Sequence, residues 1–238
     1  MTDLPFGFQP TEELPGGFCS KIYATETQVL KVPWQGEERE SGFVAALRLA
    51  FAGGVAIMKS EPATGAVLMP RIVPGTGLDV DPRPESARIE VFVRAVREVQ
   101  VLSTEGLMPL TEYLGPDPLR DELLATSGPA VFLHGDLHHE NLLLGPDGEY
   151  VVIDPKGLVG DPCFEAAAWL RNPYRSFTEP HAVRQLTLHR LETLASEFGW
   201  DPRRMLGWTL LTLRDGRDDD HPWSLCERVL RDLFDEMG

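Results

Sequence analysis

The sequence has few cysteines and no long apolar run, and both shortages restrict the class of protein. Its three cysteines, Cys19, Cys163 and Cys226, are far apart and odd in number. Such a set argues against a disulfide framework and favours a reducing compartment. Charged residues or glycines interrupt the apolar runs well before the length of a membrane span. We therefore expect a cytoplasmic protein that does not bind a membrane.

Basic residues are also scarce. The chain has 22 Lys and Arg against 37 Asp and Glu, a net charge of −15. A nucleic-acid partner is disfavoured, because it would require a basic face. The acidity can attract a cationic small molecule or serve solubility alone, and net charge does not separate these readings. The first ten residues, MTDLPFGFQP, lack the basic and apolar parts of a signal peptide.

The stretch from Val131 to Glu165 gives the strongest functional signal. An apolar segment leads into a polar loop, and a hairpin follows whose turn is marked by Asp147-Gly148 between two apolar runs. The polar residues at the open ends of these short strands are Asp136, Asn141 and Asp154.

These three residue types fit phosphoryl transfer. The reaction needs a carboxylate that orients the attacking hydroxyl, and oxygen ligands that hold Mg²⁺ on the phosphates. Asp136 can be the catalytic base, while Asn141 and Asp154 can be the metal ligands. The alternative is an ordinary hairpin with a polar loop, which does not explain why these residue types fall at this spacing.

The segments HGDLHHEN and IDPKGLVGDPCFE resemble the aminoglycoside phosphotransferases, in particular the branch that acts on the streptomycin 6-hydroxyl and on hydroxyurea. Asp136 and Asn141 match the kinase catalytic-loop pattern H-x-D-x-x-x-x-N, and Asp154 matches the metal-binding Asp further along. Protein kinases differ, since they have Arg at the place of Gly135 and Phe-Gly at the place of Pro155-Lys156.

The resemblance implies an α+β, protein-kinase-like fold with two lobes. Residues 1–72 would form a small antiparallel sheet with one helix, and residues 73–238 a larger, mainly helical lobe. It also implies ATP as co-substrate, Mg²⁺, and a small-molecule hydroxyl acceptor that can be cationic, such as an aminoglycoside. The alternatives are a kinase-like nucleotide or ligand sensor without transfer activity, and a kinase of an unrelated metabolite. The sequence does not fix the acceptor, ATP against GTP, or monomer against homodimer.

The first lobe offers a set of nucleotide-binding candidates. A glycine turn with Gly16, Gly17 and Ser20 would let backbone N–H groups approach phosphate. Lys31 lies in an apolar strand, where a charge needs a partner. By resemblance it would hold the phosphates and pair with a helix glutamate, for which we prefer Glu40 over Glu37 and Glu38. The strands expected here are residues 8–14, 21–25, 28–33, 55–58 and 66–70, and the helix is 37–52.

The segment that leaves the first lobe resembles the family's hinge. By that resemblance Met69 would border the adenine, and the Pro70 carbonyl and the Ile72 N–H would contact its edge. A strand that runs into a Pro/Gly loop explains these residues as well.

The rest of the chain is expected to be mainly helical, and the segment 103–128 is shorter than usual for the family. This shortening puts an antibiotic acceptor in question, because relatives use that region in the acceptor pocket. The acidic run at 215–221 is either a solvated loop or a rim for a cationic substrate. The expected strands are residues 130–133, 142–144 and 150–153, and the helices are 84–103, 118–126, 162–170, 179–198, 202–213 and 223–236.

Three side chains near the loop have alternative readings. His138 can donate to the transferred phosphate or orient Asp136. Lys156 can neutralise phosphate charge or form a salt bridge with Asp161 or Glu165. By resemblance, Glu165 would brace the catalytic loop. Zinc is disfavoured, because His134 and His138 lie in a loop without a completed ligand set.

Overall fold

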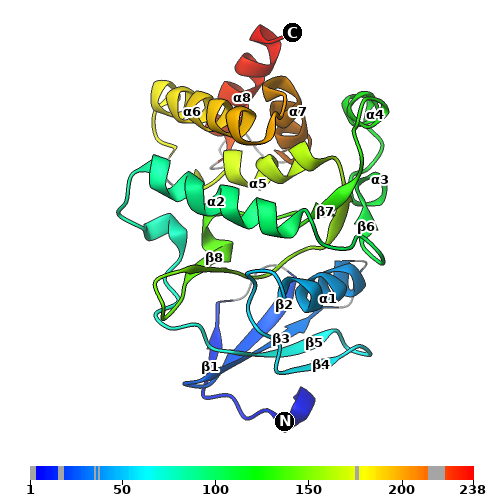
Figure 1. The fold of residues 1–238 in the computed structure, drawn as a ribbon, viewed down its shortest axis with the longest axis vertical. Coiled ribbons are helices and arrows are strands. Elements are labelled where there is room, and N and C mark those ends of the chain that lie inside the picture. The colour runs from blue at the N-terminus through cyan, green and yellow to red at the C-terminus, as the bar shows by residue number, and fades with distance from the viewer. Residues whose placement is uncertain (1–3, 16–18, 35, 37, 175–176, 214–222) are drawn as a thin grey trace.

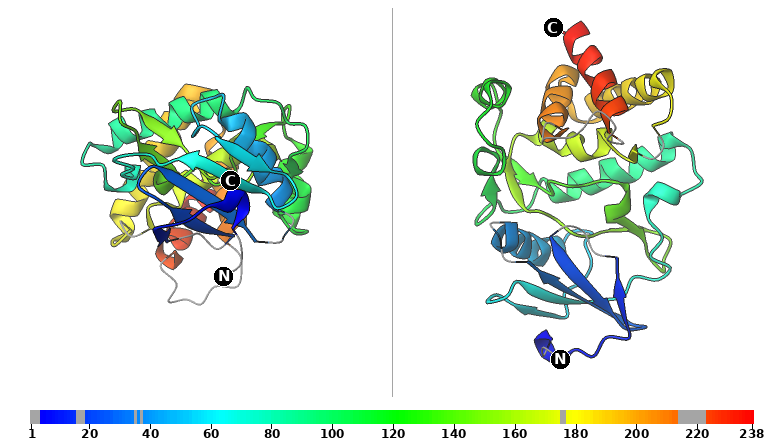
Figure 2. Two further views of the ribbon diagram at one scale, coloured as in Figure 1. Left: turned by 90° about the horizontal axis from the view of Figure 1, so that it is seen from below. Right: turned by 180° about the vertical axis from the view of Figure 1, so that it is seen from behind.

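The computed structural model describes residues 4–15, 19–34, 36, 38–174, 177–213 and 223–238. It shows two lobes stacked along the long axis of the molecule (Figure 1). One lobe contains a sheet and a single helix, and the other is mainly helical. The view from behind agrees, with the last helix, α8, at the end remote from the sheet (Figure 2). The α+β arrangement predicted from the sequence is confirmed, whereas the boundary at residue 72 stays a prediction.

The N-terminal sheet has the strand order β1-β2-β3-β5-β4, with every neighbouring pair antiparallel. Thr25 closes the turn between β2 and β3, since its Oγ1 accepts from the N–H of Gln28 at 3.1 Å. A small core of Phe8, Leu30, Ala66 and Leu68 covers one face of the sheet. The strands are β1 (Glu12–Leu14), β2 (Ser20–Ala24), β3 (Gln28–Pro33), β4 (Lys59–Glu61) and β5 (Ala66–Pro70).

Two strand predictions in this lobe were wrong in place or length. Residues 55–58 are not a strand; the Val55 N–H donates to the Val152 carbonyl of the other lobe at 3.1 Å, and β4 begins at Lys59. The backbone of this apolar segment therefore bonds to the other lobe at Val55 and does not pair there as a strand. The strand predicted for residues 8–14 covers only Glu12–Leu14. The helix α1 (Glu38–Leu49) confirms the predicted helix within its ends.

The second lobe has one large core, formed where helices pack on one another and on short strands. The apolar stripe of α2 is buried, and it includes Ile89, Phe92, Val96 and Val99. Asp117 caps α4 by accepting from the Leu119 N–H. The helices are α2 (Glu85–Val99), α3 (Leu110–Tyr113), α4 (Pro118–Ala125), α5 (Ala166–Leu170), α6 (Pro180–Phe198), α7 (Pro202–Leu213) and α8 (Ser224–Glu236).

The short strands of this lobe deliver the functional loops. The predicted hairpin is confirmed as β8 (Leu142–Leu144) paired with β9 (Tyr150–Val152). A three-stranded sheet in the order β6-β10-β7 also forms, with β6 (Met108–Pro109), β7 (Val131–Leu133) and β10 (Leu158–Gly160). Of these three, only β7 was predicted. The 3₁₀ turns are η1 (Pro5–Gly7), η2 (Leu78–Val80), η3 (His139–Asn141) and η4 (Pro162–Glu165).

Two expectations from composition concern the cysteines and the lack of a long apolar run. All three cysteines are free thiols, and Cys163 and Cys226 are buried. Within the described ranges, no helix has both the length and the apolarity that crossing a bilayer requires.

Candidate active site

His134 fixes the start of the loop that follows β7. Its ring is fully buried, and Nε2–H donates to the Ile153 carbonyl at 2.8 Å. Nδ1 in turn accepts from the Asp136 N–H at 3.3 Å. Burial lowers the pKa of His134 to about 4, so the ring is neutral at pH 7. The ring therefore ties the loop to the end of β9, as expected of a structural histidine.

Glu165 braces the same loop from η4. Its Oε2 accepts from the His134 N–H at 2.7 Å, and its Oε1 accepts from the Gly135 N–H at 3.1 Å. The predicted bracing role is thus confirmed. Burial raises the pKa of Glu165 to about 7, although both N–H bonds oppose that shift. Gly135 has a φ of +83°, and a Cβ there would lie 2.8 Å from Leu158, so this turn requires glycine.

Asn141 and Asp154 are brought together by the hairpin. Leu142 pairs with Val152, and the Ile153 N–H donates to the Asn141 carbonyl at 3.0 Å, so the two residues lie at the same end. Asn141 Nδ2 donates to the Asp136 carbonyl at 2.9 Å, which leaves Oδ1 available. Asp154 has a φ of +59°, a conformation that non-glycine residues rarely adopt and that often marks a functional site.

This donor set fits Mg²⁺. An amide oxygen and a carboxylate at one hairpin end match the one or two protein ligands that Mg²⁺ uses beside phosphates and water. Within the described part of the chain, no group of three or more His, Cys, Asp or Glu could hold a metal without such help. The site is therefore suited to a metal that arrives with a polyphosphate.

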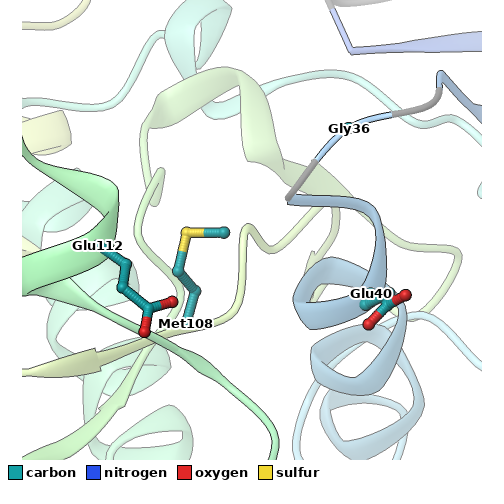
Figure 3. Close-up of a pocket in the computed structure, with 4 residues that line it drawn as sticks. All are labelled: Gly36, Glu40, Met108 and Glu112. Carbon is teal, nitrogen blue, oxygen red and sulfur yellow. The ribbon is translucent and has the colours of Figure 1, made fainter.

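Lys31 connects the two lobes. Its Nζ forms an ion pair with Asp154 Oδ1. Among the described residues it forms none with Glu40, whose side chain is exposed on α1. Glu40 instead lines a pocket of about 740 Å³ with Gly36, Met108 and Glu112. Figure 3 shows Gly36 and Glu40 on one side of this pocket and Met108 and Glu112 on the other. The nucleotide-binding role of Glu40 stays a prediction.

Helix α1 packs closely on the segment after Asp154. Ser41 Oγ donates to the Lys156 carbonyl at 2.9 Å. A Cβ at Gly157 would lie 2.4 Å from the Ser41 carbonyl oxygen and 2.7 Å from the Ala45 Cβ. Because Gly157 also has a φ of +75°, only glycine allows this approach.

Asp136, the predicted base, lies beside nitrogen atoms of Arg171 and His138. Arg171 Nη2 donates to its Oδ1 at 2.8 Å, and His138 Nε2 lies 4.0 Å from its Oδ2. Burial would raise the pKa of Asp136, but Arg171, His138, Lys156 and His134 outweigh it and keep that pKa below its usual value. Asp136 is therefore a carboxylate at neutral pH.

Sequence reasoning missed Arg171, which lies 35 residues after Asp136 at the end of a short helix. An isolated arginine at a helix end has no motif, and only the folded chain shows its partner.

The side chain of Lys156 extends to Tyr113. Its Nζ donates to the Tyr113 hydroxyl at 2.9 Å and lies 5.1 Å from the centroid of that ring. The acids proposed as alternative partners have other contacts. Asp161 pairs with Arg204 and accepts from Trp208, and Glu165 binds the loop backbone.

The nucleotide-binding candidates have separate outcomes. Gly16 and Gly17, and the acidic run at 215–221, lie outside the described residues. Ser20 is buried at the start of β2, opposite Pro33. Met69 and Pro70 are half-buried at the end of β5, and Ile72 follows them. Their contacts with a nucleotide stay predictions.

A protein-family model matches residues 81–214, more than half of the chain, and describes an aminoglycoside/hydroxyurea antibiotic resistance kinase. The matched region begins just before α2 and ends after α7. It therefore includes the loop from His134 to Asn141, the hairpin of β8 and β9, and Arg171.

Two curated relatives are similar over parts of their length. A streptomycin 3''-kinase of Klebsiella pneumoniae is 38% identical over 91 residues, which cover 37% of this chain and 34% of the relative. A hydroxyurea phosphotransferase of Kitasatospora aureofaciens is 29% identical over 201 residues, which cover 73% of this chain and 56% of the relative. The chain thus spans about a third of the first relative and little more than half of the second.

A solved structure shows the same fold. It is a thermostable mutant of aminoglycoside phosphotransferase APH(4)-Ia, in ternary complex with AMP-PNP and hygromycin B. The TM-score is 0.58 at 17% identity, and the match covers 92% of each chain. At this identity the likeness concerns the fold alone, and it confirms the predicted kinase-like architecture.

Proposed function

The chain belongs to the aminoglycoside/hydroxyurea antibiotic resistance kinase family, and from this membership we propose that it transfers the γ-phosphate of ATP to a hydroxyl of a small molecule. One observation supports this most. Asp136, Asn141 and Asp154, from separate turns, meet at the end of one hairpin, where Lys31 of the other lobe pairs with Asp154. This is the set of groups that phosphoryl transfer requires.

In the proposed reaction, Asp136 orients the acceptor hydroxyl and accepts its proton. Its low pKa keeps it ionised, and a well-placed weak base suffices because the attacking group carries little charge in a loose transition state. The loop is fixed because its backbone N–H groups donate to the Glu165 carboxylate and to His134 Nδ1. Orienting Asp136 therefore costs little at the moment of reaction.

The phosphates would lie between Lys31 and the hairpin end. Asn141 Oδ1 and the Asp154 carboxylate would hold Mg²⁺, which neutralises phosphate charge when it is bound. Lys31 would leave Asp154 for the phosphates. His138, whose Nε2 lies 4.0 Å from Asp136 Oδ2, would donate to the transferred group.

The acceptor is proposed by class. The relatives named above act on streptomycin and hydroxyurea, and both are candidates here. The pocket between the lobes contains two carboxylates, Glu40 and Glu112, which favour a cationic acceptor. Transfer to a cationic hydroxyl compound is therefore the first activity to assay. The cytoplasmic location and the monomer or homodimer state stay predictions from the sequence.

The experiment compares Asp136→Asn with Asp121→Asn, an exposed control on α4. Phosphate transfer from labelled ATP would be measured against streptomycin, hydroxyurea and hydroxylated amines. Asp136→Asn should lower turnover by about 10²-fold or more while the thermal shift with Mg²⁺ and ATP persists. Unchanged turnover in Asp136→Asn would exclude Asp136 as the base. Stabilisation by nucleotide without transfer to any acceptor would favour a sensor.

A further inference from the structure

Arg171 reaches the proposed base from a separate element. It follows the last residue of α5, and its Nη2 donates to Asp136 Oδ1 at 2.8 Å. The other oxygen, Oδ2, lies 4.0 Å from His138 Nε2, beyond hydrogen-bonding distance. Arg171 therefore takes one carboxylate oxygen, and within the described chain the second oxygen accepts no hydrogen bond.

The backbone around Arg171 is anchored by a buried arginine of α6. Arg190 Nη1 donates to the Trp169 carbonyl at 2.7 Å and to the Asn172 carbonyl at 2.6 Å, on the two sides of Arg171. Arg190 Nε donates to Glu85 of α2 at 2.6 Å, and only 1% of its side chain is exposed. Arg190 of α6, itself paired with Glu85 of α2, thus holds the segment from which the Arg171 side chain extends.

The guanidinium of Arg171 is also held at its outer face. Its Cζ lies 5.6 Å from the centroid of the Trp223 ring, a favourable cation–π distance. Trp223 in turn packs edge-on against Tyr174, with centroids 5.6 Å apart. The side chain is therefore fixed at its backbone, along its face and at its tip.

We propose that Arg171 is a positioning residue for phosphate transfer, which holds Oδ1 of Asp136 so that Oδ2 faces the acceptor hydroxyl. This inference rests on the proposed function. The terminal torsion of an aspartate is soft, so an unrestrained carboxylate samples many orientations. A charged, directional donor removes that freedom, and arginine suits the task because it stays protonated and its donors are rigidly arranged.

The first variant is Arg171→Met, which removes the guanidinium but keeps an apolar stem beside Trp223. The turnover number should fall about 10- to 100-fold, because small misplacements of a reacting group have costs of that size. The KM for ATP and the thermal shift with Mg²⁺ and ATP should stay unchanged. Arg184→Met is the matched control, since it removes an arginine from an exposed pair with Glu236, and its turnover should equal that of the wild type.

A double-mutant cycle separates positioning from folding. In an Asp136→Asn background, Arg171→Met should lower the residual turnover by less than about 3-fold, because no base is left to position. A structural role would give the same loss in both backgrounds, since the fold is needed with or without the base.

A conservative variant and a small-molecule rescue provide independent readouts. Arg171→Lys keeps the charge but not the planar fork, and it should lose about 3- to 10-fold in turnover. Guanidinium ion should restore part of the turnover of Arg171→Ala, whereas sodium ion at the same concentration should not.

Two results would overturn the proposal. Equal losses in the wild-type and Asp136→Asn backgrounds would assign Arg171 to the fold. A raised KM for the acceptor at unchanged turnover would assign it to acceptor binding. A failure of the proposed function can be told apart from these results, because it would be seen in the wild-type protein before any variant is made. A wild-type protein that transfers phosphate to no acceptor would refute both proposals.

Discussion

Lys31 of β3 and Asp154 at the end of β9 form an ion pair that joins the sheet lobe to the helical lobe. Because Asp154 is also a proposed metal ligand, the same carboxylate faces a lysine before Mg²⁺ arrives and a metal ion afterwards. Nucleotide and metal binding should therefore be coupled through this residue.

Asp154→Asn should reduce the coupling. In the wild type, Mg²⁺ should improve ATP affinity by about 10-fold or more, since coupling free energies between two ligands are commonly 1–3 kcal/mol. In Asp154→Asn the gain should be less than about 3-fold. The variant lacks the metal ligand, and metal-free ATP is no longer repelled by the Asp154 carboxylate. Calorimetry with Mg²⁺ or with EDTA measures both values. Asp147→Asn, at the exposed hairpin turn, should behave as the wild type.

Gly157→Ala should be strongly destabilising. The new Cβ would overlap the Ser41 carbonyl at 2.4 Å, at a residue with a φ of +75°. Positive φ and overpacking together should cost about 2–4 kcal/mol of unfolding free energy. Gly148→Ala is the control, since its φ is +84° but no atom lies within 4 Å of the added Cβ, and it should cost only about 1 kcal/mol. Urea unfolding compares the two, and equal losses would show that α1 can move away.

Glu165 should make stability fall as pH rises. Its folded pKa of about 7 lies above the ordinary glutamate value of 4.5, so between these values the folded state binds more protons than the unfolded state. The stabilisation is complete below pH 4.5 and is lost as pH rises to about 7, by as much as about 3 kcal/mol.

Glu165→Gln should remove this dependence. The variant is less stable than the wild type, because an amide NH₂ would face a backbone N–H, and its deficit should shrink from pH 5 to pH 8. Urea unfolding across this range measures the deficit, with the exposed Glu122→Gln as control. A deficit that stays constant across this range would show that Glu165 is charged throughout.

Arg190→Met should destabilise the helical lobe. It leaves the partly buried Glu85 without its buried partner and takes one donor from each of two carbonyls, and breaking such a pair typically costs about 3–5 kcal/mol. Thermal and urea unfolding measure the loss. The exposed Arg184→Met should leave the unfolding midpoint unchanged, and a similarly small effect in Arg190→Met would contradict the anchoring role.

Local sequence signals predicted much of this molecule. The hairpin followed from Asp147-Gly148 between apolar runs, and the predicted ranges of α2, α6 and α7 each start within a residue or two of a proline that lies at the start of the observed helix. The residues of the loop and hairpin were predicted as a set because their spacing is short. Such signals are confined to neighbours along the chain.

Long-range partners were beyond the reach of the sequence. Arg171 meets Asp136 only because α5 packs beside the loop, and Lys31 meets Asp154 across 123 positions. The strand β10 was missed because Gly157 precedes it, Gly160 is its last residue, and its pairing with β6 is parallel and only two residues long. Residues 55–58 misled because a short apolar run does not show whether its backbone pairs within a sheet, and here the Val55 N–H bonds to the other lobe.

The tight seat of α1 on Gly157 has a mechanical consequence. Because α1 is bonded through Ser41 to the Lys156 carbonyl, it would move together with the helical lobe, although in the sequence it lies between two strands of the sheet lobe. Closure over a nucleotide would then swing the five-stranded sheet alone, against a platform that already includes α1. The pivot for that swing would be the segment after β5, and the distance from Lys31 to Asp154 would record its angle.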